Sequence, residues 1–432
     1  MGVYLSTPNT EKHSEDGEKN ELSFGACAMQ GWRKNMEDEH VCLLQLRDRE
    51  DVKFFGVYDG HGGKEVARFC ARHMPGEMLI LEEFTEGQYE HALKKVFHRM
   101  DELLELPESQ AELEELKSNP LFPSAEERQE IEAKKAGEAD GANKAEEGSN
   151  GQKELFDILR GFLSTQPADN KDGKKDEKQE ATDIPLGLER RESIGSGEIG
   201  AAEAADAAEA AREAGIMVPP SSIPQFPIDV DAGEDGDSTE YFNEEAHQCA
   251  LVDHPIRAGC TSIVSVLIGN KIFTANAGDS RGVLCRKGIA VPLSFDHKPK
   301  KKREFDRIVA AEGFVNRVGR VNGNLNLSRS IGDLKYKQNK SIPPAEQIIT
   351  AEPDVSVVEI SPDDEFFVLA CDGVWDCMSN QQCVDFVRER LSRCQKLSTI
   401  CEEMLDFCIA DDPRKTTGIG GDNMSVVIVQ FK

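Results

Sequence analysis

The sequence predicts an α+β layered domain that is interrupted by a long acidic insert. Two observations lead to the fold class. Apolar runs of strand length dominate both ends of the 432-residue chain, and helical patterns are segregated from them. A third observation, a central stretch rich in charged and small residues and poor in aromatic ones, predicts the insert.

The individual elements are predicted from hydrophobic periodicity and from the turn residues that flank each run. The predicted strands are 23–30, 40–46, 52–58, 261–268, 271–277, 355–360, 365–371 and 424–431. The predicted helices are 63–73, 89–104, 300–311, 381–391 and 398–409.

The domain organisation follows from these elements. Residues 1–22 are an N-terminal segment, residues 23–104 and 249–432 are two pieces of one domain, and residues 105–248 are the insert. Stretches such as KAGEADGANKAEEGSNG bury too little apolar surface to offset the entropy of ordering, so the insert is predicted to be mostly disordered. Two segments within it, 153–163 and 201–215, have helical patterns.

Charge and cysteine content narrow the class of protein. A net charge of −29 disfavours direct nucleic-acid binding through a basic face, and it favours basic protein partners, which we expect the insert to contact. No apolar run approaches the roughly 18 residues needed to span a bilayer. The 12 cysteines form no CxxC pair, which favours buried reduced thiols and an intracellular protein.

Two short signals concern location. The start MGVYLS, with Gly2 and Ser6, fits the N-myristoylation pattern, although one acyl chain gives only weak membrane association. The cluster KPKKKR, residues 298–303, fits a nuclear-import signal. Its alternative is a solvated helix start whose charge attracts phosphorylated substrate. We expect a monomer in the cytoplasm and the nucleus.

Acidic residues stand at the ends of the predicted strands: Glu37, Asp38, Asp59, Asp279, Asp372 and Asp422. Each of them alone is explained as a turn or cap residue. Together they are not, because converging carboxylates repel one another and raise one another's pKa unless a cation neutralises them. Oxygen ligands suit Mg²⁺ or Mn²⁺, and neighbouring glycines let backbone carbonyls or water approach the ion.

The segments around these acids resemble a known family. MQGWRKNMEDEH, VYDGHGG, GCTS, ANAGDSRG, DHKP, NLSRSIGD, LACDGVWD and GGDNMSVV occur in the order found in metal-dependent serine/threonine protein phosphatases, the protein phosphatase 2C family. The resemblance covers essentially everything outside the insert and is strongest to the gamma branch. It implies a four-layer α-β-β-α sandwich with two mainly antiparallel central sheets, and phosphorylated proteins as substrates.

The resemblance also implies a metal centre of two ions with a weaker third. Asp59 would bridge two ions and Gly60 would add its carbonyl oxygen. Asp372 and Asp422 would complete the ligands of one ion. The other implied ligands are Glu37 and Asp38 for the second ion, and Asp279 for the weaker third site shared with Asp372.

Two further residues have roles implied by the resemblance. Arg33 would clamp the phosphate, which suits a planar guanidinium that binds two oxygens at once. His61 would be the general acid, because a departing serine or threonine alkoxide is a strong base that needs a proton. A lone histidine is usually structural, and its place inside DGHGG is what favours the catalytic role.

Two rival interpretations remain open from the sequence. Cys27 and Arg33 have the C-x₅-R spacing of cysteine-dependent phosphatases, in which a thiolate attacks phosphorus. The segment lacks a preceding histidine and an immediate helix start, which weakens this interpretation. The second rival is a non-enzymatic acidic scaffold on an inactive phosphatase fold, and the intact set of strand-end acids argues against it.

Overall fold

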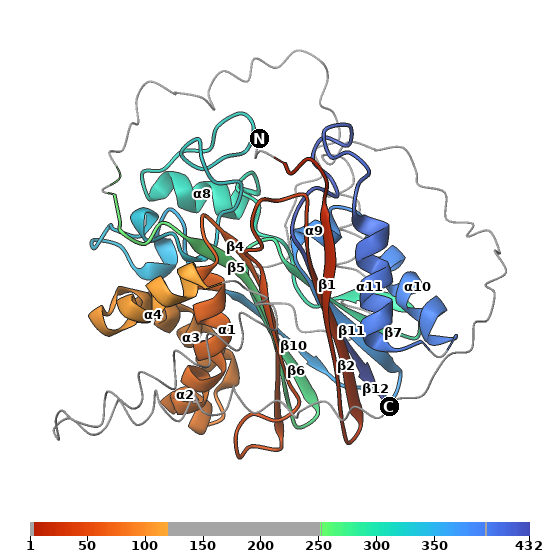
Figure 1. Ribbon diagram of the computed structural model, residues 1–432. Helices are drawn as coiled ribbons and strands as arrows, with labels where there is room; N and C mark the ends of the chain where they lie inside the picture. The colour runs from red at the N-terminus through yellow and green to blue at the C-terminus, as the bar shows by residue number, and fades with distance from the viewer. Residues whose placement is uncertain (1–3, 120–250, 252, 394) are drawn as a thin grey trace, which may run out of the picture. The chain divides into compact units, whose positions relative to one another are not determined.

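The computed structural model describes residues 4–119, 251, 253–393 and 395–432. Two antiparallel sheets lie face to face (Figure 1). The first sheet has the strand order β1 (Asn9–Lys19), β2 (Leu22–Gly31), β12 (Met424–Phe431), β11 (Asp364–Ala370), β7 (Arg281–Arg286) and β8 (Ile289–Pro292). The second has the order β10 (Asp354–Glu359), β6 (Lys271–Ala277), β5 (Gly259–Ile268), β4 (Val52–His61) and β3 (Glu39–Leu43), with β9 (Ile331–Gly332) paired to β5.

Helices cover the outer face of each sheet, so the predicted four-layer sandwich is confirmed (Figure 1). The second sheet is covered by α1 (Glu65–Ile80), α2 (Glu82–Thr85), α3 (Tyr89–Glu105) and α4 (Pro107–Ser118). The first sheet is covered by α9 (Asp372–Trp375), α10 (Asn380–Leu391) and α11 (Leu397–Cys408). Helix α8 (Lys302–Ala310) and the short 3₁₀ turns Leu334–Tyr336 and Pro344–Glu346 belong to the long connection between β8 and β10.

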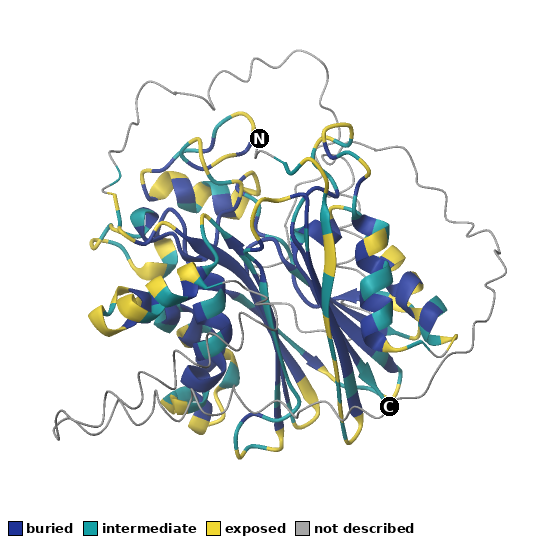
Figure 2. Ribbon diagram, in the orientation of Figure 1, coloured by how far each residue is buried: buried dark blue, intermediate teal, exposed yellow. Residues whose placement is uncertain are grey.

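Three apolar cores separate the four layers. Figure 2 shows that most of the strands in both sheets are buried. The middle core lies between the sheets, where Phe55 of β4 packs edge-on against Phe24 of β2 and Phe367 of β11, with ring centroids 6.0 and 5.8 Å apart. Because both faces of each sheet are buried, the strands are continuous apolar runs, which is why most of them were predictable from the sequence.

The N-terminal segment differs from the prediction. Residues 9–19 form β1, an edge strand antiparallel to β2. Its sequence, NTEKHSEDGEK, is polar throughout, because one of its edges faces solvent and its stability comes from backbone pairing with β2. Side chains also fix it to α11: Asp16 accepts hydrogen bonds from Ser398, and Lys12 pairs with Asp406 at 2.7 Å.

The first piece of the domain is also longer than predicted. Residues 107–118 form α4, whose Leu113 and Leu116 are buried in the core beside α1, so the insert begins after this helix and the boundary at residue 105 is wrong. The short strands β7 and β8 were not predicted. The rest of the insert, including segments 153–163 and 201–215, and the N-terminal Gly2 lie outside the described residues. None of the described helices is long and apolar enough to cross a membrane.

Candidate active site

The strand-end acids meet at one end of the sandwich, which we call the carboxylate end. Asp59 lies near the end of β4, Asp279 follows β6, and Asp372 follows β11 as the first residue of α9. Asp422 precedes β12, and Glu37 and Asp38 precede β3. All of these residues except Asp38 line a pocket of about 520 Å³, together with Arg33, Gly60 and His61. The structure thus brings the predicted site residues together from both sheets.

The carboxylates perturb one another strongly. Burial raises the pKa of Asp59 well above its usual range, and the neighbouring charges of Asp38 and Asp372 raise it further. The pKa of Asp372 is likewise raised by burial and then by Asp279. Such an arrangement costs free energy without a cation, since like charges held in a poorly solvated site favour protonation.

Asp38 is the most deeply buried of these acids. It is 1 % exposed, and burial, followed by the charge of Asp422, raises its pKa to about 7. Its Oδ2 accepts a hydrogen bond from Ser425 at 2.9 Å, whereas its Oδ1 is buried with no hydrogen-bond partner. A buried carboxylate oxygen without a donor is expected to have another ligand, and a cation fits because the charges of Asp59 and Asp422 act on the same carboxylate.

The backbone at Gly60 fits the same purpose. Any Cβ at this position would collide with the carbonyl oxygen of Glu37. Only glycine therefore lets β4 approach the loop that holds Glu37 and Asp38, which brings acids from two segments to one place. We conclude that the oxygen donors fit a hard divalent cation in their chemistry.

Two basic side chains neutralise part of this cluster. Arg33 Nη2 contacts Asp422 Oδ2 at 2.5 Å, and Lys298 Nζ contacts Asp279 Oδ2 at 2.6 Å. Within the described part of the chain, no three His, Cys, Asp or Glu side chains are arranged as ready ligands of one ion. Arg33 and Lys298 thus each hold one oxygen of an acid that lines the pocket.

The His61 side chain is held by a residue that sequence analysis did not single out. Its Nε2 lies 2.6 Å from Asp333 Oδ2, and Asp333 also accepts a hydrogen bond from Ser330 Oγ at 2.7 Å. Burial alone would lower the pKa of His61, but the charge of Asp333 reverses this and raises it. Asp333 ends the segment NLSRSIGD, so the signal was present, but its contact with a residue far away in the sequence was not predictable.

The backbone next to the His61–Asp333 pair leaves room for both side chains. Asp333 has a left-handed backbone with φ of 49°, and Gly259 on β5 pairs with His61 across the sheet. A Cβ on Gly259 would collide with both Asp333 and the His61 ring. Gly259, the glycine of the segment GCTS, therefore leaves the space that the His61 and Asp333 side chains occupy.

Several side chains of the basic cluster at residues 298–303 form ion pairs within the fold, which the sequence did not indicate. Lys298 contacts Asp279 in the pocket, and burial opposes the charge of Lys298 while Asp279 raises its pKa. Arg303 forms two hydrogen bonds with Asp354, and Lys302 pairs with Asp306. At least part of this cluster thus forms ion pairs within the fold, and Lys298 pairs with Asp279, an acid that lines the pocket.

The cysteine-dependent alternative does not fit the geometry. Cys27 lies in the middle of β2, paired with both β1 and β12, and is completely buried. Burial raises the pKa of its thiol to about 11, so it is protonated at neutral pH and cannot act as a nucleophile. All of the described cysteines are free thiols.

The fold, the pocket and the sequence together agree with one family of known proteins. A two-sheet sandwich with a pocket of strand-end carboxylates is the arrangement of a metal-dependent serine/threonine protein phosphatase. The family described as protein phosphatase 2C matches residues 22–119 and 232–417. The chain belongs to the protein phosphatase 2C family.

Individual relatives agree with this membership. A probable protein phosphatase 2C 11 of Oryza sativa is 37% identical, over 100% of this chain and 91% of the relative. Protein phosphatase 1G of Rattus norvegicus is 33% identical, over 100% of this chain and 93% of the relative. The crystal structure of a phosphatase from Toxoplasma gondii shares the fold, with a TM-score of 0.52, 19% identity and coverage of 98% of this chain and 96% of that one.

Proposed function

We propose that the pocket at the carboxylate end is where this phosphatase hydrolyses phosphoserine and phosphothreonine, with Mg²⁺ or Mn²⁺ as its metal. The observation that carries the proposal is the convergence of acids around Asp38, whose buried Oδ1 has no protein donor. Six carboxylates and one carbonyl oxygen would hold the ions: Asp59, Asp372, Asp422, Glu37, Asp38, Asp279 and the carbonyl of Gly60. When bound, such ions neutralise phosphate charge and activate water for attack.

Arg33 would bind the phosphate at the mouth of the pocket. Its side chain is 47% exposed and lies against Asp422, so it can turn from this partner to an incoming phosphate without breaking a buried contact. The guanidinium can donate two parallel hydrogen bonds to phosphate oxygens and hold the phosphorus in line with the attacking water.

His61 would protonate the leaving alkoxide. Its Nε2 is committed to Asp333, so the proton available to the substrate is the one on Nδ1. Asp333 stabilises the charged imidazolium before transfer and fixes the ring orientation. Asp333 is thus a positioning residue.

Metal dependence provides the direct test. Purified full-length chain is assayed on a phosphoserine peptide after exhaustive chelation, with Mn²⁺ or Mg²⁺ restored, and after thiol alkylation. We expect no turnover without metal, recovery with either ion, and no effect of alkylation. Turnover that survives chelation would contradict the proposal, and phosphopeptide binding without turnover at saturating metal would favour the inactive scaffold.

We further propose that the protein acts as a monomer in the cytoplasm and the nucleus. N-myristoylation at Gly2 would add only weak membrane binding, and the acidic insert would attract basic proteins. The nuclear part depends on residues 298–303. Because Lys298 pairs with Asp279 of the pocket, Lys300→Gln, at an exposed position of the cluster, is the cleaner variant for an import assay, and unchanged nuclear accumulation would argue against the signal.

A further inference from the structure

The mouth of the active-site pocket has the opposite charge to its floor. The acids on the floor are buried or half-buried; Asp279 and Asp333, for example, are each 2% exposed. Besides Arg33, four basic side chains line the pocket: Lys34, Arg257, Arg320 and Lys335. We call these four the basic rim. Lys34, Arg257 and Arg320 are exposed and Lys335 is half-buried, so the cations face solvent around an acidic centre.

This local charge contrasts with the whole protein, whose net charge is −29. Long-range attraction of the molecule therefore favours basic partners, whereas contacts within a Debye length of the pocket favour anions. Hydrolysis of one phosphate uses Arg33 and the floor. The basic rim is not needed for that chemistry and is available to the residues on either side of the phosphoserine.

Arg320 is held on an ordered loop. Its backbone N–H donates to Asn316 Oδ1 at 2.8 Å, and its Nη1 donates to the Asn324 carbonyl at 2.5 Å. The neighbouring Val321 is completely buried and pairs with Val315. Because this hairpin is already ordered, the Arg320 guanidinium loses less conformational entropy when it binds an anion.

Arg257 approaches from another direction. It lies two residues before β5, and its backbone carbonyl packs against Gly62 of the DGHGG turn. Its guanidinium pairs with Asp253 at 2.6 Å, but both side chains are exposed, at 72% and 68%. An exposed pair of this kind contributes little stability, so a substrate anion can replace Asp253.

From these positions we infer that the enzyme prefers phosphoserine or phosphothreonine flanked by anionic groups, either Asp and Glu side chains or further phosphates. A pocket of about 520 Å³ has room for more than one phosphorylated side chain, and an extended peptide advances roughly 3.3 Å per residue, so flanking side chains reach its edge. The inference rests on the proposed site, because the basic rim surrounds it.

The test compares substrates that differ only in flanking charge. Four phosphoserine peptides of equal length are given flanking Glu, Gln, Lys or a second phosphoserine, and kcat/KM is measured with the full-length chain at saturating Mn²⁺. Each exposed ion pair changes kcat/KM by a modest factor. We therefore expect kcat/KM of the Glu peptide to exceed that of the Gln peptide roughly five-fold, mainly through a lower KM, and the Lys peptide to have the lowest value. The second phosphoserine distinguishes phosphate from carboxylate recognition. Half-molar salt should reduce the Glu-to-Gln ratio.

Variants identify the residues responsible. Arg257→Gln and Arg320→Gln should each lower the Glu-to-Gln ratio, and the double variant should lower it further, with Lys34 and Lys335 accounting for any preference that remains. Arg393→Gln is the matched control, because Arg393 is also an exposed arginine, paired with Glu389 four residues away, but it does not line the pocket. The control should keep the wild-type ratio.

The outcomes separate this inference from the proposed function. If an aryl phosphate is not hydrolysed at any Mn²⁺ concentration, the proposed function fails. If it is hydrolysed but the Glu and Gln peptides have equal kcat/KM, or if the ratio is unchanged in the double variant, only the role of the basic rim is overturned.

Discussion

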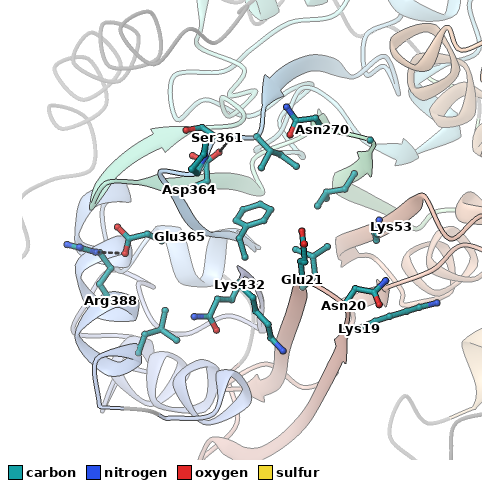
Figure 3. A pocket seen from close by; sticks show the side chains of 18 of the residues that line it. Lys19, Asn20, Glu21, Lys53, Asn270, Ser361, Asp364, Glu365, Arg388 and Lys432 are labelled. Atoms are coloured by element: carbon teal, nitrogen blue, oxygen red, sulfur yellow. Dashed lines mark hydrogen bonds and ion pairs between the residues drawn. The ribbon is translucent and has the colours of Figure 1, made fainter.

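Both ends of the sandwich carry acidic side chains. At one end the buried carboxylates raise one another's pKa, and at the other end the buried carboxylate is paired with an arginine. At the carboxylate end, Asp38 is buried with one oxygen unpartnered, and Asp59 and Asp372 have strongly raised pKa values. At the other end, a larger cavity of about 1370 Å³ is also lined by acids (Figure 3). There, the buried Asp364 is bound by both Arg286 Nε and Nη2, at 2.6 and 3.0 Å, and by the backbone N–H of Ser361.

Other acids at or near this second cavity are also paired with basic side chains. Arg388 Nε donates to Glu365 at 2.8 Å, an interaction visible in Figure 3, and Lys432 pairs with Glu18. The larger of the two cavities is therefore not the one lined by Asp59 and Asp372, the buried acids whose pKa values are strongly raised. Uncompensated buried charge is the better guide to function, because a stable fold has no reason to retain it without a ligand.

The largest expected effect is on catalysis at the carboxylate end. Asp59→Asn removes the central charge, and kcat/KM on a phosphoserine peptide should fall by about 10³-fold or more, since losing even one electrostatic contact to the transition state costs 10²–10³. Metal-free Asp59→Asn should also resist urea better than metal-free wild type, because one repulsive charge is gone. Wild-type turnover at saturating metal would contradict the assignment.

The reciprocal substitution is at the opposite end. Asp364→Asn removes the charge of a buried carboxylate that Arg286 binds through Nε and Nη2, and this should lower the free energy of unfolding by about 3 kcal/mol. The measurement is urea unfolding, alongside kcat per folded molecule, which should not change. A large loss of kcat with normal stability would mean that the two ends are not functionally distinct.

A smaller and more selective effect is expected at His61. His61→Gln should slow hydrolysis of a phosphoserine peptide by about 10²-fold, in the range of general acid catalysis, but an aryl phosphate much less, because its leaving group is a weak base. Gly259→Ala, which crowds the His61–Asp333 pair without changing either residue, should show the same selectivity more weakly. Equal losses on both substrates would show that His61 is not the acid.

The smallest effect should come from removing the insert. Replacing residues 120–250 by a flexible Gly/Ser linker keeps α4, and the chain that follows the linker returns to the same body, where His254 Nε2 lies 3.8 Å from Glu105 at the end of α3. Turnover of an aryl phosphate should stay within about two-fold, since loop length changes stability only slightly. Competition by a basic protein such as a histone should weaken. A folded but inactive deletion would make the insert part of the catalytic domain.

Most of the carboxylate end was predictable from the sequence, and the exceptions have physical reasons. Asp59 and Asp372 directly follow apolar runs, so periodicity alone places them at strand ends. Asp333 was missed because its importance depends on a contact with His61 and on a left-handed backbone. Lys298 resembled a surface charge until the fold placed it against Asp279.

The fold shows the same division. The buried strands were predicted because both of their faces are apolar. The edge strand β1 was not, because its polar sequence matches neither strand nor helix periodicity and its order comes from β2 and α11. Helix α4 resembled the charged insert, since only Leu113 and Leu116 of its second half and Ser109 are buried.

The position of β12 has a consequence for the order of events during synthesis. This strand pairs with β2 on one side and with β11 on the other, and Asp422 and Asn423 immediately precede it. On the ribosome, β1 and β2 emerge early but remain unjoined to the rest of their sheet until residue 431 has left the exit tunnel. Until β12 has emerged, the nascent chain therefore has neither a complete first sheet nor the complete set of acids at the carboxylate end.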